Sequence, residues 1–222
     1  MRPFFVILSA VCCALVAWSA NTTPTNRTAL FNGADFAGWK YVSPGSESIG
    51  AVCRVNPDGS LAVTGKPNGY LATEPTYENY KLHVEWRWTD KGGNGGVLVH
   101  ITDGPMDRIW PISFQIQTKN TRTGDLLPMS SAKFSEAPSP ELKPAQRARL
   151  AHDSEKAVGE WNTCDIICRG DSIEATVNDV LQNRVTKCVP SSGKIGFQLE
   201  GAPFELRNVW IEPLKPAENR KP

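Results

Sequence analysis

The sequence predicts an all-β protein built as a sandwich of two antiparallel sheets. Short segments rich in strand-forming residues follow one another, with turn residues between them. They do not alternate with helical segments, as the strands of a parallel sheet would. Gly (18), Pro (17) and Trp (7) are plentiful in the 222 residues, while only 21% of residues are charged. This composition is typical of a globular chain with many turns and argues against wholesale disorder.

The clearest strand is expected at residues 80–88, where apolar and polar side chains alternate. Its apolar face carries Leu82, Val84, Trp86 and Trp88. The other expected strands, in chain order, are residues 51–55, 60–64, 97–101, 113–118, 160–169, 172–178, 181–187, 194–200 and 204–213. Residues 139–151 alone have a helix-forming composition, and Pro140 and Pro144 keep any helix there short.

The first 20 residues are expected to be a secretory signal peptide. Arg2 gives a positive start, an apolar run extends from Pro3 to Trp18, and Ser19 and Ala20 offer small residues for cleavage. The alternative is a retained membrane anchor, but the run is shorter than the ~20 apolar residues that span a bilayer comfortably. We therefore expect an exported protein, periplasmic or secreted, with no stable membrane span after cleavage.

The predicted domain organisation follows from this signal. Residues 1–20 form the signal peptide, 21–28 a flexible leader, 29–215 a single domain, and 216–222 a disordered tail. The full chain has 24 Lys and Arg against 23 Asp and Glu, and loss of Arg2 brings the net charge to zero. A neutral chain has no long-range field for a polyanion, so the composition disfavours nucleic acid as a partner.

Four cysteines remain after the signal peptide is removed: Cys53, Cys164, Cys168 and Cys188. An even number in an oxidising compartment predicts disulfides. Cys164 and Cys168 cannot pair within one strand, since four residues extend ~13 Å and a disulfide needs Cα atoms within ~7 Å. The other two pairings stay open. A metal site is the rival interpretation, although there is no CxxC pair and no neighbouring His.

Polar residues two apart in sequence recur along the expected strands, and alternation places both members of each pair on one face. The pairs are Glu85 with Arg87, Gln115 with Gln117, and Gln198 with Glu200. Together with His100 and Trp110, they predict a carbohydrate-binding groove on a concave sheet. The alternative is that these are ordinary solvated sheet faces.

Several short motifs then occur in a fixed order. They are LFNG at 30–33 with Asp35 and Trp39 after it, YKLHVEWR at 80–87, GNGGV at 93–97, IWP at 109–111, GEWNT at 159–163, ICRG at 167–170, GKIGFQ at 193–198 and FELRN at 204–208. Over nearly all of residues 30–215 the chain resembles the 3-keto-disaccharide hydrolase family, formerly a domain of unknown function. The resemblance implies a jelly-roll sandwich of the concanavalin A-like lectin and glucanase type, and activity on 3-keto glycosides.

The chemistry that the resemblance implies begins at the sugar ketone. A ketone at C3 acidifies the proton on C2, so a base can remove it and the group at C1 can leave before water adds. Glu85 or His100 are candidate bases, Arg87 could face the enolate oxygen, and Glu200 could handle the leaving group or water. The alternatives are a cross-strand salt-bridge network for Glu85 and Arg87, and a backbone-bonded histidine for His100.

One departure from the family pattern separates two function classes. The family's strand reads roughly [IV]-E-x-Q, whereas this chain has Phe114-Gln115-Ile116-Gln117, and an amide cannot exchange a proton as a carboxyl group does. An ordinary retaining glucanase, which needs two carboxyl groups ~5 Å apart, is disfavoured. The chain is either an enzyme on 3-keto glycosides or a non-catalytic carbohydrate-binding module. The expected sugar-binding residues are Asn94, Trp110, Gln115, Gln117 and Gln198.

No cofactor is assigned from the sequence. A divalent metal ion held by Glu85, His100 and Glu200 is left open, because it depends on whether their strands converge.

Overall fold

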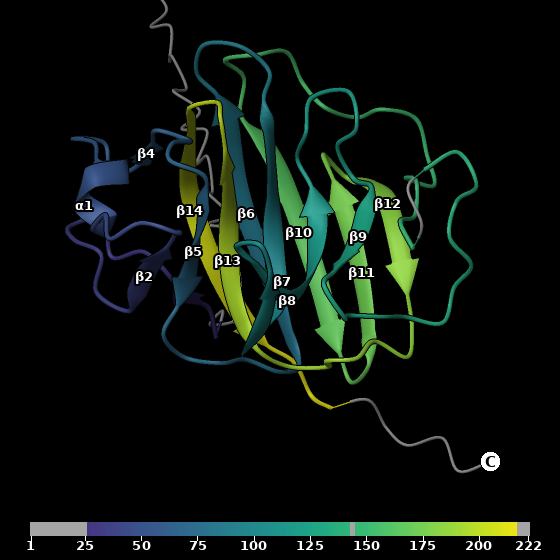
Figure 1. Ribbon diagram of the computed structural model, residues 1–222. Helices are drawn as coiled ribbons and strands as arrows, with labels where there is room; N and C mark the ends of the chain where they lie inside the picture. The colour runs from purple at the N-terminus through teal and green to yellow at the C-terminus, as the bar shows by residue number, and fades with distance from the viewer. Residues whose placement is uncertain (1–25, 143–144, 217–222) are drawn as a thin grey trace, which may run out of the picture.

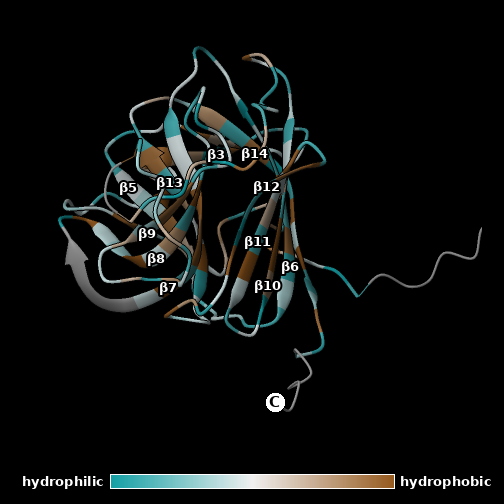
Figure 2. Ribbon diagram, turned by 90° about the vertical axis from the view of Figure 1, so that its right-hand side faces the viewer, coloured by the Kyte–Doolittle hydropathy of each residue, from teal (hydrophilic) through white to brown (hydrophobic). Residues whose placement is uncertain are grey.

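The computed structural model describes residues 26–142 and 145–216, and it is an antiparallel two-sheet sandwich as predicted. The expected signal peptide and most of the expected tail lie outside the described residues. Figure 2 shows the two sheets as two layers facing each other. In the part of the chain that is described, no helix is long and apolar enough to cross a membrane.

The eight-stranded sheet, called sheet A, contains most of the predicted strands. Its order is β12 (Val180–Val185), β11 (Ser172–Val177), β10 (Asn162–Arg169), β6 (Tyr80–Trp88), β14 (Phe204–Pro213), β4 (Leu61–Val63) and β3 (Cys53–Val55), with β1 (Thr28–Ala29) paired to β14. Strands β10, β11 and β12 lie at three of the expected strand positions and form a meander, and every pair in the sheet is antiparallel.

The six-stranded sheet, called sheet B, faces the viewer in Figure 1. Its order is β2 (Trp39–Val42), β5 (Gly69–Thr73), β13 (Lys194–Glu200), β7 (Asn94–Asp107), β8 (Trp110–Gln117) and β9 (Leu126–Met129). Strands β2, β5 and β9 were not predicted from the sequence. They are short, and β5 is buried at all five positions, so it lacks the alternation that reveals a half-exposed strand.

The core fills the space between the sheets, and β6 supplies one wall of it. Its four alternate residues Leu82, Val84, Trp86 and Trp88 are all buried, as the sequence pattern predicts. The LFNG motif also serves packing: the ring of Phe31 stacks on Trp39 at 4.3 Å, and Trp39 Nε1 donates to the Leu30 carbonyl at 2.6 Å.

Residues 139–151, which have a helix-forming composition, do not form a helix in their described parts. The helix among the described residues is α1 (Ile49–Val52), whereas the described parts of residues 139–151 form turns and irregular backbone.

The disulfide prediction is wrong for the described cysteines, because all four are free and buried. Cys53 lies on edge strand β3, and β4, β14 and β6 separate it from β10 with Cys164 and Cys168. At ~4.8 Å per strand this separation is roughly 19 Å, beyond the reach of a disulfide. Burial raises the pKa of Cys53, Cys168 and Cys188 to about 12, so these thiols stay protonated.

Candidate functional site

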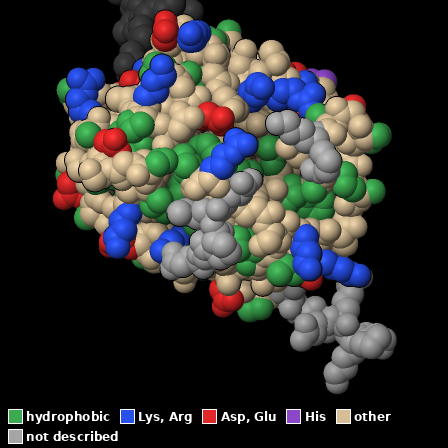
Figure 3. Space-filling view, viewed as in Figure 1, with side chains coloured by type: hydrophobic (Ala, Val, Ile, Leu, Met, Phe, Trp, Pro, Cys, Tyr) green, Lys and Arg blue, Asp and Glu red, His purple; other side chains and the backbone are tan. Residues whose placement is uncertain are grey.

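A cleft of about 620 Å³ lies on the face of sheet B that points away from sheet A. Figure 3 views this face of the molecule. Strands β7, β8, β9 and β13 contribute residues to the cleft. The other lining residues lie between or after these strands: Arg108, Lys119, Arg122, Asp125, Ser130, Glu141, Leu142 and Gln146.

Alternation along β8 and β13 sends their polar side chains into the cleft. On β8, Phe114 and Ile116 enter the core, so Gln115 and Gln117 face the other way. On β13, Phe197 and Leu199 enter the core, and the residues after each of them, Gln198 and Glu200, line the cleft.

Strand pairing brings these residues together from three strands. Gly96 on β7 lies between Gln198 on β13 and Gln117 on β8, and Asn94 lies opposite Glu200. All five predicted sugar-binding residues and Glu200 line this one cleft.

The floor of the cleft is a continuous chain of hydrogen bonds, here called the amide chain. Gln115 Nε2 donates to Gln117 Oε1 at 2.9 Å and to Gln198 Oε1 at 2.8 Å. Gln198 Nε2 then donates to Glu200 Oε2 at 2.8 Å, and Asn94 Nδ2 donates to the same oxygen at 2.6 Å. The amide chain therefore ends on the Glu200 carboxylate, which receives two donors on one oxygen.

Gly96 makes room for the amide chain. A Cβ atom at this position would lie 2.5 Å from Gln115 Cγ and 2.7 Å from its Nε2. The missing side chain lets Gln115 lie across β7 and reach both of its glutamine partners.

We expect Gly96→Ala to displace Gln115 and to break its bonds to Gln117 and Gln198. Leaving buried acceptors without donors costs about 1–3 kcal/mol, so the melting temperature and the affinity for a sugar ligand should both fall. Thermal unfolding and calorimetric titration with trehalose would measure these effects. Gly50→Ala is the matched control, because a Cβ atom there meets open space apart from Ser48 at 4.0 Å. A Gly96→Ala protein with unchanged ligand affinity would contradict this role.

An apolar wall adjoins the polar floor. Tyr70, Ala72, Leu98 and Ile101 form a buried cluster apart from the main core, and half-buried Trp110 packs against it and lines the cleft. A site with a row of amides beside an indole ring suits a sugar, which offers both hydroxyl groups and an apolar C–H face.

Charged residues that were not singled out from the sequence also line the cleft: Arg108, Lys119, Arg122, Asp125 and Glu141. Arg122 Nε is 2.7 Å from Asp125 Oδ2. Lys119 could have been found, since it continues the i, i+2 series of Gln115 and Gln117 by one step. The others come from turns and loops, whose position the sequence pattern does not show.

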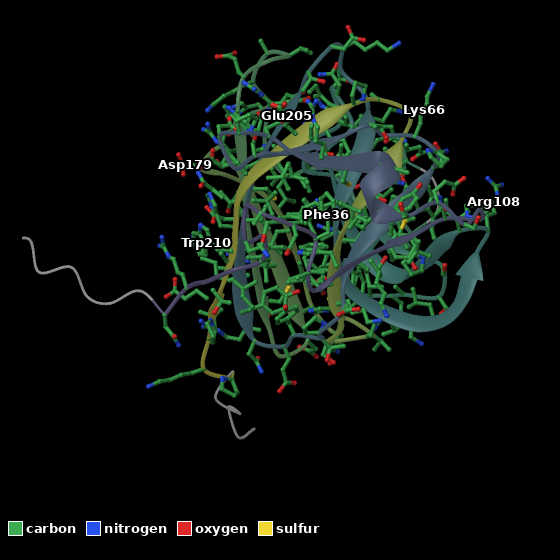
Figure 4. All side chains as sticks on the ribbon, turned by 90° about the vertical axis from the view of Figure 1, so that its left-hand side faces the viewer. Phe36, Lys66, Arg108, Asp179, Glu205 and Trp210 are labelled. Atoms are coloured by element: carbon green, nitrogen blue, oxygen red, sulfur yellow. The ribbon has the colours of Figure 1, made fainter. Side chains whose placement is uncertain are left out.

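Glu85 and Arg87 lie on the outer face of sheet A, on the far side of the sandwich from the cleft. Glu85 Oε2 accepts from Arg207 Nε at 2.6 Å and Glu85 Oε1 from Asn208 Nδ2 at 2.6 Å, while Arg87 Nε donates to Glu205 Oε2 at 2.7 Å. Figure 4 shows Trp210, on strand β14 of sheet A, and Arg108 on opposite sides of the molecule. The expectation that Glu85 and Arg87 share a site with Glu200 is corrected, because the inward Trp86 turns its neighbours on β6 outward.

The environment of Glu85 fits the salt-bridge alternative. Its partial burial acts to raise its pKa, but the hydrogen bonds from Asn208 and Arg207 and the charge of Arg207 outweigh burial and lower the pKa. Trp161 has the guanidinium groups of Arg87 and Arg207 over its ring at 4.5 and 4.1 Å. The network is a set of cross-strand pairs on a solvated sheet face.

His100 lies in the core between the sheets, and its placement with the cleft residues is also corrected. Its ring makes edge contacts with Tyr80 and Phe114, and its Nδ1 lies 3.1 Å from the Pro190 carbonyl oxygen. The pairing of β7 with β8 shifts register after Val99, and His100 has a φ of 55°. This bulge interrupts the alternation and turns the imidazole inward. The backbone bond is the one expected under the alternative interpretation.

Burial of His100 makes the protein's stability depend on pH. Desolvation lowers the pKa of His100 to about 4, against 6.5 when it is exposed. Between these values the unfolded chain takes up a proton that the folded protein does not, so stability falls as pH falls through this window. From pH 7 to pH 5 we expect a loss of about 2 kcal/mol from this group. Urea unfolding at both pH values would measure it, and a His100→Asn protein with the same pH slope as the wild type would contradict it.

The three residues of the hypothetical metal site do not lie together in the structure. Glu85 lies on the outer face of sheet A, His100 in the core and Glu200 in the cleft. Within the described residues, no group of three or more His, Cys, Asp or Glu residues could hold a metal ion.

Known structures share the fold at low sequence identity. A "putative glycosyl hydrolase" from Parabacteroides distasonis ATCC 8503 has 21% identity and a TM-score of 0.64, with 86% of this chain and 94% of that chain covered. A Bacillus licheniformis β-glucanase has 14% identity and a TM-score of 0.56, with 87% and 99% covered. The carbohydrate-binding module CBM66 from Bacillus subtilis has 13% identity and a TM-score of 0.56, with 79% and 95% covered. These likenesses establish the jelly-roll fold.

Sequence comparison with protein families is more specific. No curated protein shows a significant sequence match. The family described as "3-keto-alpha-glucoside-1,2-lyase-like domain" matches residues 26–212, which is most of the chain and includes every strand of both sheets apart from the final residue of β14. The chain therefore belongs to the 3-keto-alpha-glucoside-1,2-lyase-like family, in the concanavalin A-like jelly-roll fold.

Proposed function

We propose that the protein cleaves 3-keto glycosides in the cleft of sheet B, with Glu200 as the proton-transferring group. Family membership supports a carbohydrate substrate, and the observation that carries the assignment is the position of Glu200. Its carboxylate lies in the cleft and accepts from Asn94 at 2.6 Å and from Gln198 at 2.8 Å. These two bonds orient the carboxylate toward a ligand without filling the cleft.

In the proposed reaction, Glu200 is the single group that takes up and returns a proton. The Glu200 carboxylate takes the proton from C2, and the C–H electron pair forms an enolate with the C3 ketone. The enolate electrons then expel the oxygen at C1, which takes the proton back from Glu200 as the alcohol leaves. Water adds across the resulting C1–C2 double bond, with its hydroxyl group on C1 and its proton on C2. Lys119 and Arg108 line the same cleft, and their charge suits stabilisation of the enolate oxygen in place of Arg87.

A comparison of oxidised and unoxidised sugars tests this proposal. Purified protein should release glucose from 3-keto-trehalose and none from trehalose, whose C2 proton is not acidified. Release at equal rates from both sugars would contradict a mechanism that depends on the ketone.

The second candidate is a carbohydrate-binding module, favoured by the glutamine at position 115 of the cleft floor. In that case 3-keto-trehalose would bind, seen as heat in a calorimetric titration, and no glucose would appear. An exported location, expected from residues 1–20, stays a prediction that fractionation of cells would test.

A further inference from the structure

In the amide chain, the carboxylate of Glu200 determines which atom of each glutamine donates and which accepts a hydrogen bond. An ionised carboxylate only accepts, so Gln198 must turn its Nε2 toward Glu200, at 2.8 Å. The Oε1 of Gln198 then faces Gln115 and accepts a hydrogen bond from Gln115 Nε2 at 2.8 Å. At the far end, Gln117 Oε1 accepts from Gln115 and also from the backbone N–H of Lys119, at 3.2 Å. Each glutamine is thereby fixed in one of its two amide orientations.

Gln115 stands at the centre of this arrangement and is 2% exposed. Its Nε2 faces three acceptor oxygens: those of Gln117 and Gln198, and the Gly95 carbonyl at 3.3 Å. A carboxyl group at position 115 would offer these oxygens at most one O–H, and none when ionised. The three acceptor oxygens around Nε2 thus match an amide better than a carboxyl group at this position.

We infer that Gln115 is a positioning residue that orients Glu200 through Gln198 and orients Gln117 directly, and that it does not replace a lost catalytic acid. The inference rests on the proposed function of the cleft. Since Gln117 Oε1 is used within the amide chain, its Nε2 is left as a donor toward the cleft, while Glu200 provides the acceptor at the other end. The floor therefore matches a sugar that offers an oxygen acceptor at the Gln117 end and a proton at the Glu200 end.

Introducing the family's glutamate tests the inference, because the two interpretations predict opposite results. If position 115 had lost a catalytic acid, Gln115→Glu should raise the release of glucose from 3-keto-trehalose. We expect kcat at saturating substrate to fall at least tenfold, since Gln198 and Glu200 lose their fixed orientation. An increase in kcat would overturn the inference. If Gln115→Glu does not fold, Gln115→Met replaces it, with the same expected loss and with wild-type kcat as the contradicting result.

Melting temperatures test the direction of the amide chain without any substrate. Gln115→Glu should lower the melting temperature by about 5 °C, as expected when buried acceptors lose their donor. Adding Glu200→Gln should recover part of this loss, because residue 200 can then donate to Gln198, which can turn and donate to residue 115. A double variant no more stable than the sum of the two single changes would overturn the inference.

Gln182→Glu is the matched control for a purely structural effect. Gln182 is fully buried, and its Nε2 donates to the His152 carbonyl at 3.0 Å and to Ser154 Oγ at 2.8 Å, outside the cleft. This variant should lose stability without losing kcat, and Glu200→Gln should not rescue it. If the wild-type protein cleaves no 3-keto glycoside, the proposed function fails. The melting temperatures of the wild type, Gln115→Glu, Glu200→Gln and the double variant still decide the inference.

Discussion

Glu200→Gln is expected to lower kcat for 3-keto-trehalose by about a thousandfold, within the range that a positioned general base contributes. Glutamine keeps the shape of the side chain and can still accept from Asn94, but it cannot take the C2 proton. Binding should change less than kcat, because the proton moves only in the transition state. Initial rates of glucose release across substrate concentrations would separate the two constants.

Two further substitutions make this result specific. Glu174→Gln is a matched control on sheet A, where Glu174 pairs with Arg184 at 2.6 Å, and it should leave kcat unchanged. Glu85→Gln tests the catalytic role first expected from the sequence. Loss of turnover in Glu85→Gln together with an active Glu200→Gln would place the reaction on the outer face of sheet A and contradict the proposal.

Phe197→Ala is expected to have the largest effect on stability, about 3–5 kcal/mol. The side chain is 2% exposed and its ring stacks near Trp39 at 5.6 Å and Phe31 at 6.2 Å, so its loss leaves a cavity between the sheets. Phe197 precedes Gln198 on β13, so a shift of this strand also disturbs the cleft floor.

Denaturant unfolding at pH 7 would measure the Phe197→Ala effect. Leu150→Ala serves as the control, because Leu150 is 56% exposed and its truncation should change stability by less than about 0.5 kcal/mol. Equal losses in the two variants would mean that the inter-sheet core does not dominate stability.

Residue alternation determined much of the fold and part of the site. The period of two in β6, β8 and β13 predicts the strands and shows which residues share a face, because successive side chains of a strand point to opposite sides. It was sufficient to pair Gln115 with Gln117 and Gln198 with Glu200. It could not detect β5, which is buried on both faces.

Only the tertiary structure decided in which sheet, and on which surface of the molecule, each pair of polar residues lies. Glu85 with Arg87 and Gln198 with Glu200 have the same spacing, yet one pair lies outside sheet A and the other in the cleft of sheet B. Spacing within a strand is a local property, whereas the partner strands that complete a site are set by long-range pairing. The bulge at His100 shows the same limit within a single strand, since one extra residue reverses the direction of a side chain. The sequence by itself therefore predicted the pairs of site residues within each strand. The register of β7, β8 and β13, which only the tertiary structure shows, brings these pairs together around Glu200.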